Sequence, residues 1–210
     1  MIATPAAGLI ILTAAAWLIG SVPFGYLAGR WQGIDIRSGG SGNIGATNVL
    51  RLLGPVPGAA VLLLDVLKGA FAVALAGALV FEPTAWFQLA AAVAVIAGHC
   101  WTPFLRFKGG KGVATTAGAL LYLVPEVMLI ALGAWLIILL VTRIVSVASM
   151  AGTGLAFLIL IIGGHEPAFQ IAGGLAMVLV WTRHRENVRR LLKGTEARLG
   201  AKPPSAPPAA

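Results

Sequence analysis

Residues 38–48 read SGGSGNIGATN; they follow a long apolar run and precede an arginine. Gly40, Gly42 and Gly45 in this stretch satisfy the pattern G-x-G-x-x-G, the fingerprint of dinucleotide-binding folds. Such a fold needs β-strands that alternate with amphipathic helices. The flanking apolar segments are too long and too continuous to be buried strands. The stretch is therefore interpreted as a glycine loop between two membrane helices, and the dinucleotide fold is excluded.

The composition is that of a membrane protein. Of the 210 residues 59% are apolar and only 10% are charged, and the mean hydropathy of +0.93 lies far outside the range of soluble domains. We therefore predict an all-α, polytopic membrane protein. Residues 1–196 are expected to form a single integral-membrane domain, whose first apolar segment is retained because it is too long for a signal peptide. The proline- and alanine-rich residues 197–210 are predicted to be a disordered tail.

Seven apolar segments can be recognised, although the later ones are short for a helix that crosses a bilayer. The stretch 113–142 is either one long helix or two helices that are bent at Pro125 and Glu126. The segments cover approximately residues 5–29, 54–81, 85–105, 113–124, 126–142, 144–163 and 167–182.

The charged residues favour two helices over residues 113–142. Lysine and arginine flank the cytoplasmic ends of membrane spans and are scarce in short exported loops. A single crossing over residues 113–142 would export Arg143 or the basic C-terminus. We therefore predict about seven transmembrane helices, with a break near Pro125, the N-terminus outside and the C-terminus in the cytoplasm. The exported turns then hold Glu82, Glu126, His165 and Glu166.

Two charges lie within the second apolar segment. Asp65 and Lys68 are three residues apart and so share one face of a helix. An ion pair is the least costly way to hold either charge in a membrane. A buried pair that packs helices together is the favoured interpretation, and a direct contact with substrate stays open.

The glycine-rich and cation-rich segments all fall on the predicted cytoplasmic side. Glycines let the backbone approach a ligand closely and turn N–H groups toward an anion, while lysine and arginine supply charge. Together they indicate a phosphate site. The segments are residues 39–51, 98–116 and 184–196, with a smaller polar patch at residues 142–149.

The sequence KGGKGVATT, residues 108–116, is not a P-loop. No glycine stands five residues before Gly110, and Val113 occupies the region where a magnesium-binding hydroxyl is required. ATP hydrolysis is therefore not supported.

Four polar side chains are the strongest candidates for ligand contacts. Arg51 and Lys111 lie in runs of glycine and small polar residues, which favours a ligand role over simple anchoring at the membrane surface. His184 and Asn187 are three residues apart, so on a helix they share a face and can contact one ligand.

Other polar residues are less decisive. Ser146 and Ser149 also share a helical face, but a hydroxyl bonded to its own helix backbone is the default expectation. For His99, a structural hydrogen bond and a role in the site are equally favoured. The three histidines lie on both predicted membrane faces, so a common metal site is not expected. No Gly-x-Ser-x-Gly elbow occurs, and a covalent nucleophile is not evident.

Three stretches resemble the signatures of the bacterial acyl-phosphate:glycerol-3-phosphate acyltransferases, the PlsY family. SGNIGATNVLR at residues 41–51 resembles the first signature. FKGGKGVAT at residues 107–115, preceded by GH at residues 98–99, is similar to the second. H-x-x-N-x-x-R-L-x-x-G-x-E at residues 184–196 resembles the third. The matches occur in family order and extend over nearly the whole chain apart from the tail.

The resemblance implies transfer of a fatty acyl group from acyl phosphate to the sn-1 hydroxyl of glycerol 3-phosphate. The products would be lysophosphatidic acid and phosphate, in the first step of phosphatidic acid synthesis. It also implies a multi-pass protein of the bacterial inner membrane, with its active site facing the cytoplasm and without cofactor or metal. The expected partners are the two substrates and membrane lipid; nucleic acid is not expected and no protein partner can be inferred. Because acyl phosphate is already activated, no covalent acyl-enzyme is expected.

Carried over to this sequence, the resemblance implies a polar site made of Ser41, Arg51, Lys111, His184 and Asn187. Arg51 and Lys111 would bind phosphate, while His184 and Asn187 would orient glycerol 3-phosphate. Either His184 or a substrate phosphate could take the hydroxyl proton. Glu196 is interpreted as structural. The remaining candidates for substrate contacts, with the glycines supplying backbone N–H groups, are Gly42, Asn43, Gly45, Thr47, Asn48, Gly109, Gly110, Gly112, Ser146 and Ser149.

A membrane carrier or binder of a phosphorylated solute is the alternative. Carriers are commonly built from internal repeats, with polar groups near the bilayer midplane. Only Asp65 and Lys68 are deep in this sequence, and no convincing repeat is found. The acyltransferase is therefore the favoured interpretation.

Overall fold

The computed structural model describes residues 5–79 and 84–200, and in these ranges the chain is all-helical, as predicted. The helices, in chain order, are α1 (Pro5–Ser21), α2 (Phe24–Trp31), α3 (Ala46–Leu53), α4 (Pro55–Leu79), α5 (Ala85–Cys100), the 3-10 helix η1 (Pro103–Leu105), α6 (Val113–Leu123), α7 (Pro125–Thr142), α8 (Val145–Ile162), α9 (Pro167–Arg183) and α10 (Arg185–Leu192).

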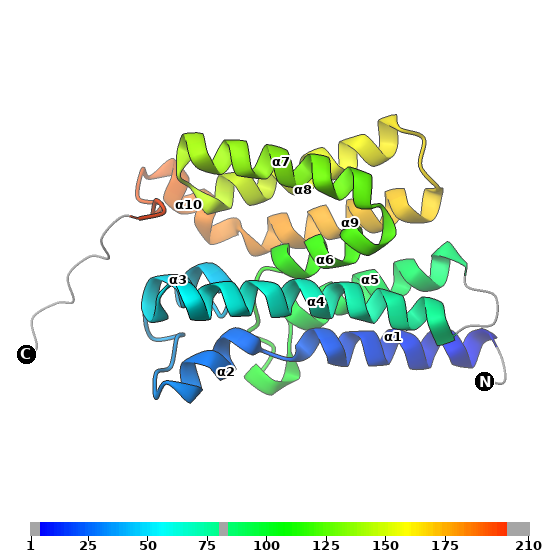
Figure 1. Cartoon of the computed structure of the whole chain (residues 1–210), viewed down its shortest axis with the longest axis horizontal. Helices are drawn as coiled ribbons and strands as arrows, with labels where there is room; N and C mark the ends of the chain where they lie inside the picture. Colours follow the sequence, from blue (N-terminus) through cyan, green and yellow to red (C-terminus); the bar gives the residue numbers. More distant parts are fainter. Residues whose placement is uncertain (1–4, 80–83, 201–210) are drawn as a thin grey trace, which may run out of the picture.

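The long helices run side by side along the long axis of the molecule (Figure 1). The short helices α2, α3 and α10 lie together at one end, and α1 begins at the other end. Five helical stretches are long and apolar enough to cross a membrane, while α6 is apolar but shorter. These five are residues 6–31, 55–79, 85–105, 125–142 and 145–162.

The predicted break near Pro125 is confirmed. Helix α6 ends at Leu123 and α7 begins at Pro125. Proline has no N–H to donate and disfavours the helical conformation of the residue before it. The 11 residues of α6 are therefore only about 17 Å long, whereas the 25 residues of α4 extend for about 37 Å. Helix α6 lies in the middle of the bundle, away from the end at which α3 and α10 lie (Figure 1).

The first apolar segment, predicted as one run over residues 5–29, is also broken. Helix α1 ends at Ser21 and α2 begins at Phe24. The carbonyl of Ser21 accepts a 2.7 Å hydrogen bond from the Thr102 hydroxyl, and the carbonyl of Val22 accepts one of 2.9 Å from Lys68 Nζ. Irregular backbone at membrane depth is tolerated only when its polar groups have such partners. The break thus gives Lys68 a structural role.

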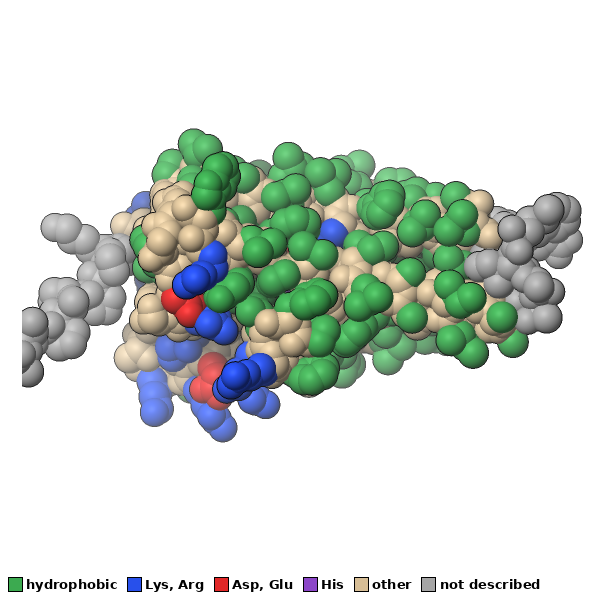
Figure 2. All heavy atoms as spheres, turned by 90° about the horizontal axis from the view of Figure 1, so that it is seen from below, with side chains coloured by type: hydrophobic (Ala, Val, Ile, Leu, Met, Phe, Trp, Pro, Cys, Tyr) green, Lys and Arg blue, Asp and Glu red, His purple; other side chains and the backbone are tan. Residues whose placement is uncertain are grey.

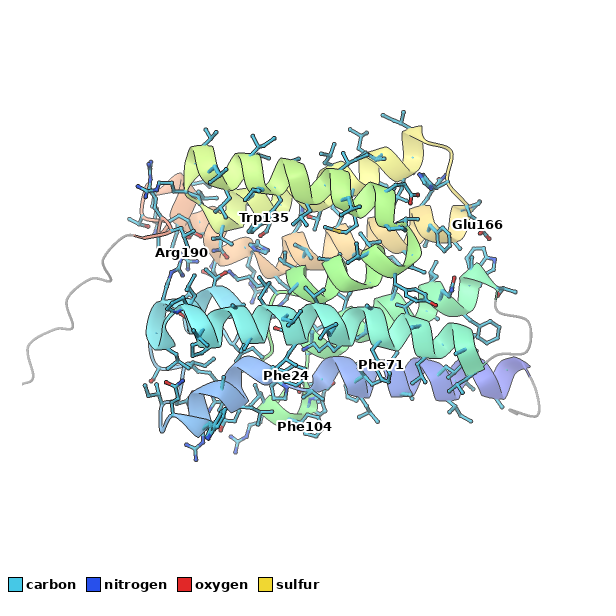
Figure 3. The ribbon with its side chains drawn as sticks, viewed as in Figure 1. Phe24, Phe71, Phe104, Trp135, Glu166 and Arg190 are labelled. Carbon is cyan, nitrogen blue, oxygen red and sulfur yellow. The ribbon has the colours of Figure 1, made fainter. Side chains whose placement is uncertain are left out.

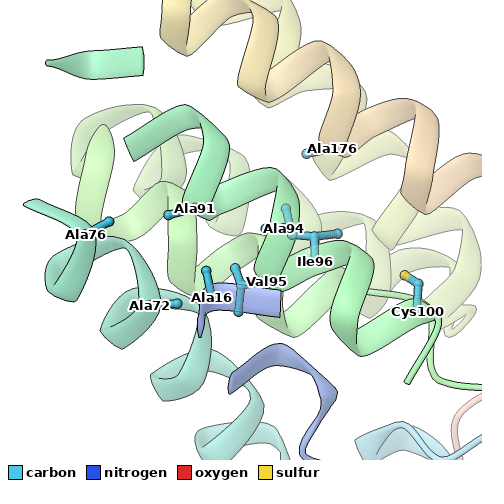
Figure 4. Packing of buried hydrophobic residues seen from close by; sticks show 9 residues of the cluster. All are labelled: Ala16, Ala72, Ala76, Ala91, Ala94, Val95, Ile96, Cys100 and Ala176. Carbon is cyan, nitrogen blue, oxygen red and sulfur yellow. The ribbon is translucent and has the colours of Figure 1, made fainter. Parts of the chain in front are cut away.

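Small residues let the helices approach closely. A Cβ on Gly98 of α5 would collide with the carbonyl of Trp17 in α1, and a Cβ on Gly118 of α6 would collide with that of Val66 in α4. Close backbone contact of this kind drives helix association in membranes, where the hydrophobic effect between helices is lost. A buried cluster of mostly small side chains follows the same pattern (Figure 4): Ala16, Ala72, Ala76, Ala91, Ala94, Val95, Ile96, Cys100 and Ala176.

The surface is divided by chemistry. Apolar side chains cover most of the length of the bundle, and lysine and arginine gather at one end on the face seen in Figure 2. Leu63, Leu67 and Phe71 of α4 are among the exposed apolar residues. A contiguous apolar surface of this size marks contact with lipid rather than water. The cation-rich end is where the predicted site residues lie.

Candidate active site

A network of polar side chains joins the loop before α6, the start of α8 and the segment around α10. Lys111 Nζ donates a 2.7 Å hydrogen bond to Asn187 Oδ1, and Asn187 Nδ2 donates to Glu196 Oε1. The same carboxylate accepts 2.7 Å hydrogen bonds from the Ser146 hydroxyl and from Arg190 Nε. Glu196, expected only to be structural, is thus the centre of the network. Arg190 lies at the cation-rich end of the bundle in Figure 3.

The site carries an excess of positive charge. Burial lowers the pKa of Lys111 to about 8; Glu196 opposes this shift, and Arg190, Arg51 and Arg183 add to it. Burial also lowers the pKa of Arg51, whose charge feels those of Glu196 and Arg190. Lys111 therefore lies close enough to Arg51, Arg183 and Arg190 to feel their charges, and Glu196 is the acidic group that opposes them. Like charges repel unless an anion joins them, so this arrangement suits a phosphate.

His184 lies at the junction of α9 and α10 and is buried, with 2% of its surface exposed. Its Nδ1–H donates a 2.8 Å hydrogen bond to the carbonyl of Val180. Burial and the charge of Lys111 lower the pKa of His184 to about 4, so the ring is neutral near pH 7. Because the proton is on Nδ1, Nε2 presents a lone pair and can accept a hydrogen bond from a hydroxyl.

The loop that carries Lys111 is held on both sides. The N–H groups of Gly109 and Gly110 donate to the carbonyls of Cys100 and His99, at 3.1 and 2.9 Å. The carbonyls of Gly109 and Gly110 each accept a 3.0 Å hydrogen bond from the Arg183 guanidinium. These two glycine N–H groups were expected to face a phosphate, but the chain itself uses them. Gly112, in the left-handed region with φ +81°, instead leads directly into α6.

Helix α6 begins immediately after Lys111 and Gly112. The first N–H groups of a helix have no partner within it and carry partial positive charge. These N–H groups lie next to the Lys111 loop, and a helix start of this kind suits the binding of an anion.

The first glycine loop is shaped by asparagines. Asn48, with 1% of its surface exposed, accepts a 2.8 Å hydrogen bond from the Ser41 N–H and donates to the carbonyls of Ile36 and Gly39. Asn43 Oδ1 accepts a 2.8 Å hydrogen bond from the Gly45 N–H. Both asparagines were expected to contact substrate, but their side chains stabilise the loop because its backbone offers more polar groups than regular structure can satisfy.

The remaining candidates of the first loop are not joined to the network. The Gly42 N–H donates to the carbonyl of Gly39, which closes a turn. The hydroxyls of Ser41 and Thr47 make no hydrogen bond to any residue that the structure describes. Ser41 is exposed, so its side chain is free to meet a ligand.

The two serines of α8 have different partners. Ser146 joins Glu196, whereas the Ser149 hydroxyl accepts a 3.3 Å hydrogen bond from the indole N–H of Trp135 in α7. Neither hydroxyl donates to its own helix backbone, which had been the default expectation. Ser146 therefore belongs to the site, and Ser149 ties two helices together.

Arg183 was not singled out from the sequence, and no motif around it indicated its role. Its guanidinium also lies over the ring of Trp101, 5.7 Å from the centroid. Arg190 could have been found from its spacing, because Asn187 and Arg190 are three residues apart on α10 and share a face.

The part of the C-terminus with a defined position extends further than expected. Residues 197–200 have a defined position, and the Leu199 N–H donates a 2.6 Å hydrogen bond to the carbonyl of Arg143. The rest of the predicted tail, residues 201–210, lies outside the described residues. This contact fixes the segment that follows Glu196 against the corner between α7 and α8.

Comparison with known proteins extends over nearly the whole chain. A family model described as glycerol-3-phosphate acyltransferase matches residues 10–194. A glycerol-3-phosphate acyltransferase of Synechococcus sp. (strain CC9902) is 47% identical over 195 residues, which are 92% of this chain and 96% of that protein. One of Thermus thermophilus is 46% identical over 197 residues, which are 90% of this chain and 97% of that protein.

Two crystal structures share this fold. Both are of PlsY (YgiH), described as an integral membrane glycerol 3-phosphate acyltransferase. Its glycerol 3-phosphate form has a TM-score of 0.87 at 40% identity and covers 91% of this chain and 96% of that chain. Its lysophosphatidic acid form has a TM-score of 0.85 at 39% identity and covers 91% and 95%. At this identity the likeness extends to the sequence as well as the fold.

Proposed function

Since this chain belongs to the glycerol-3-phosphate acyltransferase family, we propose that it transfers a fatty acyl group from acyl phosphate to the sn-1 hydroxyl of glycerol 3-phosphate. The products are lysophosphatidic acid and inorganic phosphate. The observation that supports this most strongly is the polar network that joins Lys111 to Arg190 through Asn187 and Glu196. Arg51 and Arg183 add positive charge near Lys111. Both substrates carry a phosphate, so both gain from such a site.

The roles of the residues follow from their contacts. Arg51 and Lys111 bind phosphate, together with the N–H groups at the start of α6. Asn187 holds Lys111 in place through its 2.7 Å hydrogen bond. His184 Nε2 accepts a hydrogen bond from the attacking hydroxyl and orients it toward the acyl carbon. Ser41, which is exposed in the first glycine loop, contacts the substrate through its hydroxyl.

The chemistry needs no covalent intermediate. The hydroxyl oxygen forms a bond to the acyl carbon, and the bond from that carbon to the phosphate oxygen breaks. The hydroxyl proton passes to the departing phosphate. We assign it there because a His184 pKa of about 4 makes the imidazole a weak base, whereas a phosphate titrates near pH 6. The protein contributes positioning and stabilisation of charge on the leaving group.

We further propose that the cation-rich end faces the cytoplasm of a bacterial inner membrane, with seven crossings. Arg190 and Glu166 lie at opposite ends of the bundle in Figure 3, which agrees with a basic cytoplasmic end and an exported turn at Glu166. Cysteine substitutions at exposed positions of each end, labelled from one side of a sealed vesicle, test this orientation. Labelling of both ends from the same side would contradict it.

The activity is tested with the purified protein. With acyl phosphate and glycerol 3-phosphate we expect lysophosphatidic acid and phosphate in equal amounts. Acyl-CoA and the acyl thioester of acyl carrier protein, offered as competing donors, should not replace acyl phosphate. Folded protein that gives no turnover with acyl phosphate, or that only moves labelled glycerol 3-phosphate into vesicles, would contradict the proposal.

A further inference from the structure

A buried polar cluster lies beneath the site and is not used by the reaction proposed above. Lys68 Nζ and Asp65 Oδ1 of α4 form an ion pair at 2.6 Å, with both side chains less than 5% exposed. The same oxygen, Asp65 Oδ1, lies 3.5 Å from His99 Nδ1 of α5. The three residues therefore form a line from the break between α1 and α2, which Lys68 contacts at Val22, to the end of α5.

The line continues into the loop that carries Lys111. A Cβ on Gly110 would collide with His99 Nε2, so the imidazole edge lies directly against the backbone of Gly110. The His99 carbonyl accepts the Gly110 N–H at 2.9 Å. His99 thus supports the residue before Lys111 through both its ring and its backbone.

The orientation of the ring follows from its neighbours. Asp65 Oδ1 is an acceptor and lies 3.5 Å from His99 Nδ1, so Nδ1 is the nitrogen whose proton the carboxylate favours, and Nε2 is the one that faces Gly110. Asp65 and Lys68 already neutralise each other, so His99 is not needed as a counter-charge. Its position between the carboxylate and the loop points instead to a role in holding the loop.

We propose that Asp65 and His99 position the Lys111 loop, with His99 as a positioning residue that keeps Lys111 at the site of phosphate binding. Arg183 clamps the same loop from the other side through the carbonyls of Gly109 and Gly110. Lys111 is therefore held between a clamp from α9 and a support from α4 and α5. The kinetic part of this proposal rests on the proposed function, and its structural part does not.

The test compares His99→Asn with His165→Asn. Asparagine at position 99 keeps a donor toward Asp65 and removes the ring edge that lies on Gly110. His165 lies in the turn between α8 and α9, so the same substitution there leaves the loop untouched. Competitive labelling of lysine amines at several pH values, read by mass spectrometry, gives the pKa of Lys111 without turnover.

The charged and titratable groups near Lys111 are Glu196, which follows α10, Arg190 of α10, Arg51 of α3, Arg183 of α9 and His184. In His99→Asn the loop loosens and Lys111 gains water, so its pKa should rise by about one unit from its value of about 8. The kcat/KM for glycerol 3-phosphate should fall on the order of 10- to 100-fold, because small displacements of a positioning group have such effects. His165→Asn should change neither quantity.

The outcomes separate the two proposals. An inactive wild-type chain contradicts the proposed function but leaves the labelling result to decide the role of His99. A folded His99→Asn variant whose Lys111 pKa stays at the wild-type value overturns the positioning role, whether or not activity falls. If His99→Asn does not fold, His99→Gln is measured instead; its longer side chain restores part of the contact, so a smaller rise in the pKa is expected, and no rise overturns the proposal.

Discussion

Lys111 Nζ and Asn187 Oδ1 are 2.7 Å apart, although 76 residues of sequence separate them. This hydrogen bond joins the loop before α6 to α10. The fold thus brings the second and third signature stretches into direct contact. Loss of either side chain should therefore change the position of the other.

We expect Lys111→Ala and Arg51→Ala to abolish activity without unfolding the protein. Each removes one of the cations that surround the proposed phosphate, and hydrogen bonds to charged groups contribute about 1.5–3 kcal/mol each. The lower end of this range corresponds to a loss of about 10-fold in kcat/KM, which is the smallest effect that we expect. Release of phosphate and formation of lysophosphatidic acid measure the activity, and thermal unfolding in detergent measures folding.

Lys193→Ala is the control for these variants. Its side chain is exposed and forms no ion pair with any residue in the described ranges. It should keep wild-type activity. Retention of most activity by both Lys111→Ala and Arg51→Ala would show that the phosphate is bound elsewhere.

The rate should fall as the pH rises through about 8. Burial lowers the pKa of Lys111 to about 8, and only the protonated amine can pair with phosphate. In kcat/KM, which reports the free enzyme, the loss is therefore expected on the alkaline side near that value. A bound phosphate raises the pKa of the lysine, so the corresponding limb of kcat should lie at higher pH. The role of Lys111 is contradicted if the alkaline limbs of kcat and kcat/KM lie at the same pH, or if neither profile has an alkaline limb.

Glu196→Gln should destabilise the protein by about 1–3 kcal/mol at pH 7, because three hydrogen-bond donors lose a charged acceptor. Burial alone would raise the pKa of Glu196, but hydrogen bonds from Ser146, Asn187 and Arg190 outweigh it and hold the pKa below its ordinary value. A lowered carboxylate pKa stabilises the folded state above the unfolded pKa, and this stabilisation is lost as the pH falls through the folded pKa. The gap in thermal stability between wild type and variant should therefore close in acid.

Glu186→Gln is the matched control for this change. Glu186 pairs with Arg189 at 2.8 Å, but both side chains are more than half exposed. Exposed pairs contribute at most about 1 kcal/mol. If Glu186→Gln loses as much stability as Glu196→Gln, the effect comes from the change in net charge and not from the hydrogen bonds to Glu196.

Two glycines in the membrane helices should respond in opposite directions. In Gly118→Ala the new methyl collides with the carbonyl of Val66, so α4 and α6 must separate at a cost of about 1–3 kcal/mol. A Cβ on Gly133 meets no atom of the described residues within 4 Å. Gly133→Ala should therefore stabilise α7 by about 0.5–1 kcal/mol. Thermal unfolding of the two variants tests this, and equal effects would contradict close packing of α4 on α6.

The helical segments could be predicted because their signals are local. The break at Pro125 depends on one residue and on the charges on either side of it, and both are visible in the sequence. The break at Ser21–Phe24 was missed, since its stability depends on Thr102 and Lys68, which are remote in sequence. A pattern of apolar residues cannot show where such distant donors will lie.

The site shows the same contrast. Arg51, Lys111, His184 and Asn187 were selected from charge and spacing, and the structure gathers them at one end of the bundle. Asn48 was predicted to contact substrate because the sequence looks the same whether an asparagine in a glycine loop faces a ligand or the backbone of the loop. The fold shows that the Asn48 side chain faces the backbone. It likewise shows that Ser146 is a hydrogen-bond partner of Glu196, which lies 50 residues further along the chain.

Glu196 follows the last helix, yet Ser146, Asn187 and Arg190 all depend on it as an acceptor. The close contacts at Gly98 and Gly118, which pack the helices together, involve none of these residues. Assembly of the helical bundle and organisation of the polar site are therefore separable properties of the chain. A preparation that has lost the carboxylate can still contain folded protein, so the yield of folded protein is not a measure of the active fraction.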